Sequence, residues 1–502
     1  MTTQSFKFSL GGSYNTRVSA TNVLSSASGI VGVGVGGIMV VGLAGATTTK
    51  DQRFVNVFSE KVLNPYTGKI TIYTVKRPGF APSMTPQAGS IGTAILVWTG
   101  SASKIISAFG TINSTLYNST TSLGTITGKS TGLTETFVGA NVATVVSSSS
   151  DSTAWYYDVP TAVATKITDA DFPGNAGETI VGTFAHMDGY AFIMDAKGRV
   201  WNSDLNSVTS WTAASFVSAN SYPDAGVAVV RSGNKILAMG TESVQFYYNN
   251  PNGTGALSPL SRIETMTQKV GCVSADAITQ LDNAVYWVGS SAQSGYSVYQ
   301  YDATVKRIST PEIEAILIIA GAGSTSLSSL KFYGRSFVIV TAGSVTFVYC
   351  VEENAWHEWS STFPLWYKCA GISSGAAQVS YSVSNTSTSG KVYTINPTSY
   401  VFQDDGTAYT AFIQTSQFGE GNKKTRWDYI QLTCDTQSSS SPMTVAVSDN
   451  DYASFTTMGT MDLSKPIPRL NRLGAAYRRA WSFSHSANTP MRVEAMVGQR
   501  TS

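Results

Sequence analysis

Three histidines, His186, His357 and His485, are the side chains of this 502-residue chain best suited to acid–base or metal chemistry near neutral pH. None of them belongs to an HExxH pattern or to another spacing typical of metal ligands. No GxSxG elbow marks a nucleophile, although a triad could still assemble in space. We therefore predict structural roles for the three histidines and no catalytic residue.

Acidic residues cluster at Asp449–Asp451 (Asp-Asn-Asp) and at Asp404–Gly406 (Asp-Asp-Gly). Their oxygens suit calcium, but neither segment has the twelve-residue loop of a calcium-binding hand. Asp, Asn and Gly also stabilise tight turns, so we predict turns at both places and no bound metal. No glycosidase-type pair of carboxylates stands out, although folding can bring distant acids together.

The densest aromatic cluster is Trp356–Trp359 (Trp-His-Glu-Trp), followed by Trp366 and Tyr367. Such rings could form a platform on which sugars stack. Large aromatic side chains also dominate protein cores, and we favour a core role for this cluster.

Cysteine and glycine patterns give no cofactor site. No CxxC motif is present, which disfavours a zinc ribbon or a thioredoxin-type redox site, and buried free thiols are the simpler interpretation. A glycine run at residues 32–37 is not followed by the Lys-Ser/Thr that would hold a phosphate. We predict no cofactor. The four cysteines are Cys272, Cys350, Cys369 and Cys434.

The composition is ordered and nearly neutral. Charged residues make up 13% of the chain, the aromatic fraction is 11%, and 33 basic against 31 acidic side chains give a net charge of +2. Disorder and long coiled coils both need many more charges, and a sequence-specific nucleic-acid binder needs a basic excess. The N-terminus lacks the basic and apolar regions of a signal peptide, so we expect synthesis in a cytoplasm.

One uncharged segment, Asn22–Ala46, is long enough to span a bilayer as a helix. Its centre alternates Val and Gly with a period of two, which disfavours a helix. We expect a glycine-rich hairpin or loop that serves as an insertion or a subunit contact. Membrane contact through residues 22–46 is the alternative, and it would require the segment to be hidden until needed.

A repeated theme predicts the fold. A turn, an apolar strand, a second turn and an aromatic strand recur at intervals of about 45 to 50 residues, the period of four-stranded propeller blades. Radial stacking of blades buries both faces of each sheet. The predicted class is all-β: an irregular six- or seven-bladed β-propeller with an additional C-terminal β-sandwich-like domain. The hairpins begin with strands at residues 92–98, 189–195, 234–240, 283–289, 334–340 and 378–383.

The predicted domains are an N-terminal arm with the Gly/Val-rich insertion (residues 1–50), the propeller (51–410) and a C-terminal β domain (411–502). The last of these holds a charged cluster, Lys423–Arg426, among alternating half-buried strands. Thr310–Leu317, which has a cap-like threonine and a proline in the first turn, is the one good short helix.

Four stretches, in order along most of the chain, resemble the tail hub or nozzle proteins of short-tailed bacteriophages, also called packaged-DNA-stabilisation proteins. The Gly/Val segment departs from the family pattern and resembles an insertion. The four stretches are Asp51–Glu60 with Arg77–Phe80, Ile236–Tyr248 with Gln268–Cys272, Ser297–Tyr301 with Ile308–Glu314, and Ser448–Tyr452 with Arg472–Gly474 and Arg478–Met496.

The resemblance implies a non-enzymatic virion protein, made in the host bacterial cytoplasm. It implies a homo-hexameric ring at the distal end of the tail that retains packaged DNA and gives the channel for its ejection. The implied partners are a portal-adaptor ring, a tail needle or plug, tailspikes or fibres, and double-stranded DNA that passes without sequence-specific binding. A near-neutral channel wall suits this role, because each phosphate contact would add affinity that resists passage.

Two other classes remain open from the sequence. A carbohydrate-binding or glycosidase-type propeller would need acids and aromatic rings that converge in one pocket. A tail fibre would show repetitive triple-helical β patterns, which this sequence lacks.

Overall fold

The structure is a computed structural model in which packing divides the chain into two units. The first unit falls within Met1–Ala81, Phe347–Phe363 and Ser399–Ser502, and the second within Pro82–Thr346 and Pro364–Thr398. The residues that the structure describes are 3–9, 52–63, 68, 70–98, 104–250, 257–291, 294–360, 366–372, 379–384, 389–419 and 423–501. The Gly/Val-rich segment at 22–46 lies outside them.

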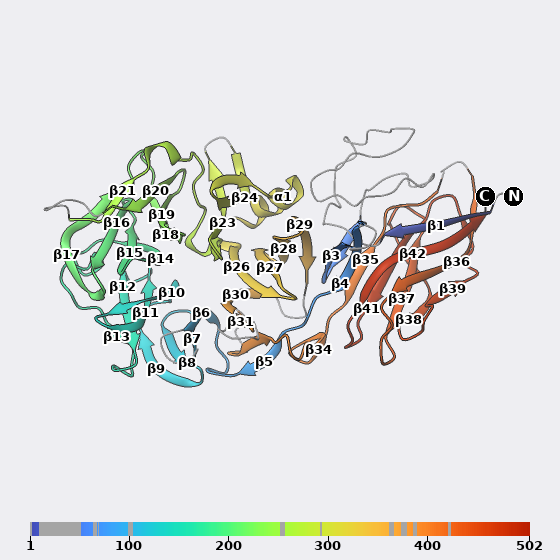
Figure 1. The fold of residues 1–502 in the computed structure, drawn as a ribbon, viewed down its shortest axis with the longest axis horizontal. Coiled ribbons are helices and arrows are strands. Elements are labelled where there is room, and N and C mark those ends of the chain that lie inside the picture. Colours follow the sequence, from blue (N-terminus) through green and yellow to red (C-terminus); the bar gives the residue numbers. More distant parts are fainter. Residues whose placement is uncertain are drawn as a thin grey trace. The chain divides into compact units, whose positions relative to one another are not determined.

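The second unit is a β-propeller whose described strands form seven blades. The innermost strand of each blade packs against those of the two neighbouring blades, and the seventh packs against the first, which closes the ring (Figure 1). The sequence predicted six or seven blades, and the structure has seven. The innermost strands are β6 (Gly92–Trp98), β10 (Gly132–Val138), β14 (Ile180–Met187), β18 (Gly226–Ser232), β22 (Ile278–Leu281), β26 (Thr325–Phe332) and β30 (Trp366–Ile372).

The outer strands of the first three blades follow one another as antiparallel hairpins. Blades two and three also share a pairing between Val138 and Ser207, so that they form one eight-stranded sheet. The outer strands are β7 (Lys104–Phe109), β8 (Ser114–Asn118) and β9 (Thr121–Ile126); β11 (Asn141–Ser148), β12 (Thr153–Asp158) and β13 (Thr165–Lys166); and β15 (Tyr190–Asp195), β16 (Arg199–Asp204) and β17 (Ser207–Ser218).

The remaining blades follow the same plan. The helix α1 (Pro311–Ala320) precedes blade six, and its N-cap Thr310 and first-turn proline confirm the predicted helix. The outer strands are β19 (Lys235–Gly240), β20 (Val244–Asn249) and β21 (Leu260–Arg262); β23 (Ala284–Ser291), β24 (Ser294–Asp302) and β25 (Thr304–Arg307); β27 (Arg335–Ala342) and β28 (Val345–Cys350), of which Phe347–Cys350 falls in the first unit; and β31 (Ser380–Ser384) and β32 (Val392–Ile395).

The seventh blade is completed by β5 (Ala81–Met84), which precedes the first blade in sequence and pairs with β32. One blade therefore combines strands from the two ends of the propeller segment. The pairing of β5 with β32 fastens the chain that leads into the first blade to the last blade, and it closes the ring.

The propeller core lies between blades. Successive residues of a strand point to opposite faces, so Val145 packs in the cluster shared with blade three while Val146 packs in the cluster shared with blade one. Ile236 and Leu237 divide in the same way between the clusters of blades three and five. Strands that are apolar on both faces explain the aromatic and β-branched sequence of each repeat.

The first unit is a β-sandwich, as the fold prediction states for the C-terminal region. One sheet has the order β3-β4-β42-β36-β39, with β1 paired to β42 and β40 to β36. Its strands are β1 (Thr3–Ser9), β3 (Val57–Leu63), β4 (Ile70–Lys76), β36 (Thr425–Cys434), β39 (Arg469–Asn471), β40 (Ala475–Ala476) and β42 (Arg492–Thr501).

The second sheet of this unit runs in the order β29-β2-β35-β41-β37-β38. Between the two sheets lies one apolar core, in which the Trp427 and Trp481 rings meet edge to face at 5.4 Å. The strands are β2 (Arg53–Val55), β29 (Ala355–Trp359), β35 (Ala411–Gln414), β37 (Pro442–Ser448), β38 (Thr456–Asp462) and β41 (Ala480–His485), and a hairpin of β33 (Gln403–Asp404) and β34 (Thr407–Ala408) precedes β35.

These units differ from the predicted boundaries after residues 50 and 410. Strands β2 to β4 and β29 pair within the sandwich, although they lie in the segment expected to form the propeller. Strand pairing across hundreds of residues leaves no local pattern in the sequence. Among the described residues, no helix is long and apolar enough to cross a membrane.

Candidate functional sites

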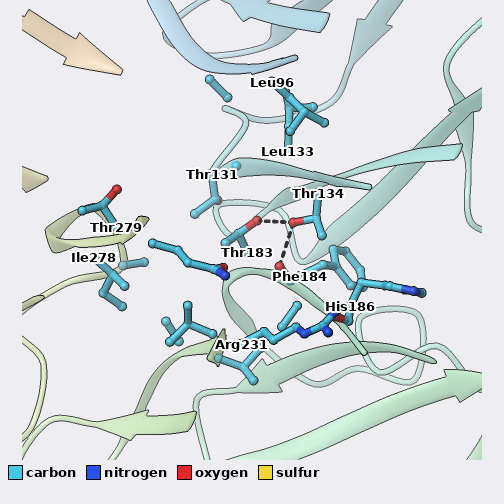
Figure 2. A pocket seen from close by; sticks show the side chains of 18 of the residues that line it. Leu96, Thr131, Leu133, Thr134, Thr183, Phe184, His186, Arg231, Ile278 and Thr279 are labelled. Carbon is cyan, nitrogen blue, oxygen red and sulfur yellow. Dashed lines mark hydrogen bonds between the residues drawn. The ribbon is translucent and has the colours of Figure 1, made fainter. Parts of the chain in front are cut away.

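A cavity of about 590 Å³ lies on the propeller axis, lined by the innermost strands of blades one to six (Figure 2). Five of its described lining residues are threonines. Thr134 donates to the backbone oxygen of Phe184 at 2.7 Å, and its Oγ1 lies 3.5 Å from Oγ1 of Thr183. Short β-branched residues suit inner strands, where seven sheets converge on a narrow axis.

Only three of the described lining residues are titratable: Glu135, His186 and Arg231. The Arg231 guanidinium donates to the backbone oxygens of His186 (3.1 Å) and Gly233 (2.7 Å). Burial, and then repulsion from Arg231, lowers the pKa of His186, which favours its neutral form. Glu135 is the sole carboxylate among the described residues of this lining, whereas glycoside hydrolysis uses a pair.

A second polar centre is buried in the sandwich around Arg77, which follows β4. Its guanidinium forms a two-point ion pair with Asp404, at 2.7 Å between Nη2 and Oδ2 and 3.1 Å between Nη1 and Oδ1. Both side chains are fully buried. Arg77 also donates from Nε to Oδ1 of Asn56 (2.9 Å) and from Nη2 to the backbone oxygen of Ser360 (3.2 Å).

The Arg77 centre joins four distant segments of the chain. Asn56 has a left-handed backbone (φ 57°), and its Oδ1 also accepts from the Ser360 amide. The ring of Tyr409 lies 3.9 Å from the guanidinium carbon, and its hydroxyl donates to the Arg77 backbone oxygen. Burial alone would lower the pKa of Arg77, but Asp404 and then Tyr409 raise it above its ordinary value, so the guanidinium stays charged.

Beside this pair, Lys76, His485 and Ser441 form a buried chain of polar groups. Nε2 of His485 lies 2.8 Å from Oγ of Ser441, and Nδ1 lies 3.4 Å from Nζ of Lys76. Burial lowers the pKa of His485 to about 3, and burial with repulsion from Arg77 lowers that of Lys76 to about 7. The arrangement has the order of a serine–base relay, yet all three residues are fully buried, so a substrate has no access to Ser441.

His357 also lies in the interior and is fully buried on β29. Its Nε2 accepts from the Ser59 amide at 3.5 Å, and burial lowers its pKa to about 3. The histidines that the sequence singled out therefore lie in three different places, one on the axial cavity and two inside the sandwich. The structure does not bring them together.

Both acidic segments form turns. Asp405 and Gly406 have positive φ angles at the tip of the β33–β34 hairpin, and Asp449 follows β37, where its carboxylate pairs with Arg479 through two bonds of 2.7 Å. Among the described residues, no group of three His, Cys, Asp or Glu side chains could hold a metal ion.

The aromatic cluster belongs to the interior where it is described. Trp356 and Trp359 are buried, and the Trp356 ring lies 5.1 Å from that of Tyr349. The side chains of Trp366, Tyr367 and Cys369 lie outside the described set. Cys272 and Cys350 are buried free thiols, and Cys434 is a half-buried one.

The comparisons with known proteins bear on the propeller. The model of one protein family, described as "Bacteriophage P22 Gp10, beta-propeller", matches residues 95–378, more than half of the chain. The chain belongs to this phage-stabilisation family. It is thus a structural protein of the phage tail and of the virion, in a family that stabilises packaged DNA. The match runs from β6 in the first blade to the last blade.

Other comparisons add less. A search of curated proteins finds no match. Among solved structures, Raptor from Chaetomium thermophilum aligns with a TM-score of 0.37 and 10% identity over 63% of this chain and 28% of Raptor. BamB from Moraxella catarrhalis aligns with a TM-score of 0.35 and 10% identity over 60% of this chain and 82% of BamB. This chain thus spans less than a third of Raptor.

Proposed function

We propose that this protein forms the distal nozzle, or hub, of a short phage tail, where it retains packaged DNA and provides the channel for ejection. The family match over residues 95–378 carries the proposal. The low content of charged residues supports it, because a wall with few phosphate contacts lets DNA slide. The axial cavity has one carboxylate among its described lining residues, which gives the glycosidase alternative no paired acids there.

The proposed assembly is a homo-hexameric ring attached to a portal-adaptor ring. A tail needle or plug would close the ring, and tailspikes or fibres would surround it. The propeller itself has an axial cavity of about 590 Å³ among its described residues. We propose that the DNA channel forms between subunits of the ring.

The experiment is to package DNA in an infection that lacks this protein. We expect heads that fill and then lose their DNA, while the purified protein restores retention when it is added to the defective particles. Particles that stay full and lack only host attachment would instead indicate a tailspike-like role. A glycan array probed with the purified protein tests the carbohydrate-binding alternative directly.

For segment 22–46, which lies outside the described residues, we propose an insertion or subunit contact, with membrane contact during ejection as the alternative. Deletion of Gly29–Ala46 separates the two roles considered for it. Normal tail assembly with lost infectivity would support membrane contact, whereas loss of assembly would refute it.

A further inference from the structure

One edge of the sandwich carries a concentration of positive charge that the proposed function does not yet use. The segments 423–431 and 469–478 together contain six basic residues and one acid, Asp428, whereas the whole chain has a net charge of only +2. The remainder of the protein is therefore net negative. The six residues are Lys423, Lys424, Arg426, Arg469, Arg472 and Arg478, which we call the basic ridge.

Strand pairing brings the ridge together. Thr425 pairs with Ala476 and Gln431 pairs with Arg469, so β36 and the β39–β40 segment run antiparallel along the end of the sheet (Figure 1). Lys423 and Lys424 directly precede β36, and Arg478 follows β40 by two residues. At about 3.3 Å per residue, segment 423–431 spans roughly 26 Å, which matches about eight base pairs of B-DNA.

The ridge side chains are exposed, and the one ion pair that described residues form with them is that of Arg426. Arg426 pairs with Asp428 at 3.2 Å, but its side chain is 73% exposed. Arg469 instead lies 3.7 Å from the Tyr429 ring and donates to Oδ1 of Asn471 at 2.8 Å, which holds it extended along the surface. Tyr477, next to Arg478, is 56% exposed.

We propose that the basic ridge binds the phosphate backbone of duplex DNA without sequence preference. Exposed Lys and Arg side chains in rows, with aromatic rings among them, suit a polyanion with one charge per about 1.7 Å. Few contacts give weak, salt-sensitive binding, so the ridge would slow the duplex without trapping it. This inference rests on the proposed tail function, and it names the basic ridge as the surface that would hold back the packaged DNA.

A structural explanation predicts something different. Charged side chains on an edge strand also prevent edge-to-edge aggregation, and that role needs no DNA. A binding measurement distinguishes the two explanations. If the charges only prevent aggregation, their removal should lower solubility and leave DNA binding unchanged.

The test is fluorescence anisotropy of a mixed-sequence 40-base-pair duplex with the purified full-length protein at three salt concentrations. The ridge variant is Lys423→Gln/Lys424→Gln/Arg478→Gln. The control, Lys129→Gln/Lys166→Gln/Lys306→Gln, removes the same charge from exposed propeller lysines. Each phosphate contact contributes about 0.9 to the slope of log K against log salt. We expect the ridge variant to bind at least about tenfold more weakly with a shallower slope, and the control to stay within about twofold.

Three outcomes would overturn the inference: no binding by the wild type, equal loss in both variants, or no loss in the ridge variant. Ring formation in negative-stain images is scored in parallel for every variant. Intact rings without DNA binding would refute the ridge and leave the tail function standing, whereas a failure to rescue DNA retention with the wild-type protein would count against the function itself. An acidic protein partner would appear as lost attachment to the tail with unchanged DNA binding, which also refutes the ridge proposal.

Discussion

Replacing Asp404 by Asn removes the only carboxylate that the described contacts place on the buried guanidinium of Arg77. The Asn side chain keeps the shape of Asp, so the lost interaction is the charge, and its amide NH₂ would meet either Nη2 of Arg77 or the Phe80 amide, both of which are donors. An uncompensated buried charge destabilises a protein by about 3–5 kcal/mol. For a unit of this size, that loss corresponds to a fall in melting temperature on the order of 10 °C.

A two-unit chain need not unfold in one transition, so hydrogen exchange followed by mass spectrometry is the suitable assay. We expect lost protection in sandwich peptides and unchanged protection in propeller peptides. The matched control is Asp435→Asn, which weakens the 3.2 Å pair with Arg492, because the Asp435 side chain is 53% exposed. Exposed pairs contribute about 1 kcal/mol or less. An Asp404→Asn effect no larger than that of Asp435→Asn would refute the reasoning.

Three further predictions concern the same unit. Gly79→Ala would place a Cβ 2.0 Å from the Gln403 backbone oxygen, so we expect the free energy of unfolding, measured in urea, to fall by about 2 kcal/mol or more. The control Gly323→Ala, whose Cβ would meet open space, should change it little. Burial lowers the pKa of His357 and of His485 from 6.5 to about 3 in the folded protein. The stability of the protein is therefore full above pH 6.5 and is lost as the pH falls toward 3, and at pH 5 each histidine should lower the free energy of unfolding by roughly 2 kcal/mol. A free energy of unfolding that stays constant in an acid titration would contradict this. Lys76 has a folded pKa of about 7 against 10.5, so stability should rise with pH across that window, and Lys76→Met should abolish the rise in paired denaturation curves.

Much of the propeller could be predicted because its signals are local. Turn residues and apolar–aromatic strand pairs predicted the hairpins that the structure confirms as β19–β20, β23–β24 and β31–β32. The turn at Asp404–Gly406 was predicted correctly for the same reason. The blade number depends on which strands pack around the axis, and no signature in the sequence fixes that register.

The Arg77 centre could not be predicted in the same way. Arg77 and Asp404 lie 327 positions apart, and neither residue differs in type from many surface residues. From the sequence we predicted only a turn at Asp404, although Asp404 serves both as a turn residue and as the counter-ion of Arg77. The one available signal was the Arg-Pro-Gly-Phe stretch at 77–80, which carried part of the family resemblance.

The central claim, that this protein builds the distal hub of a phage tail, is tested most directly by cryo-electron microscopy of purified virions that contain it. The account predicts a sixfold ring at the end of the tail whose subunits each show a seven-bladed propeller and a β-sandwich, around a channel wide enough for duplex DNA. A tail without such a ring, or a ring in which this chain lies only on the outside and borders no channel, would contradict it.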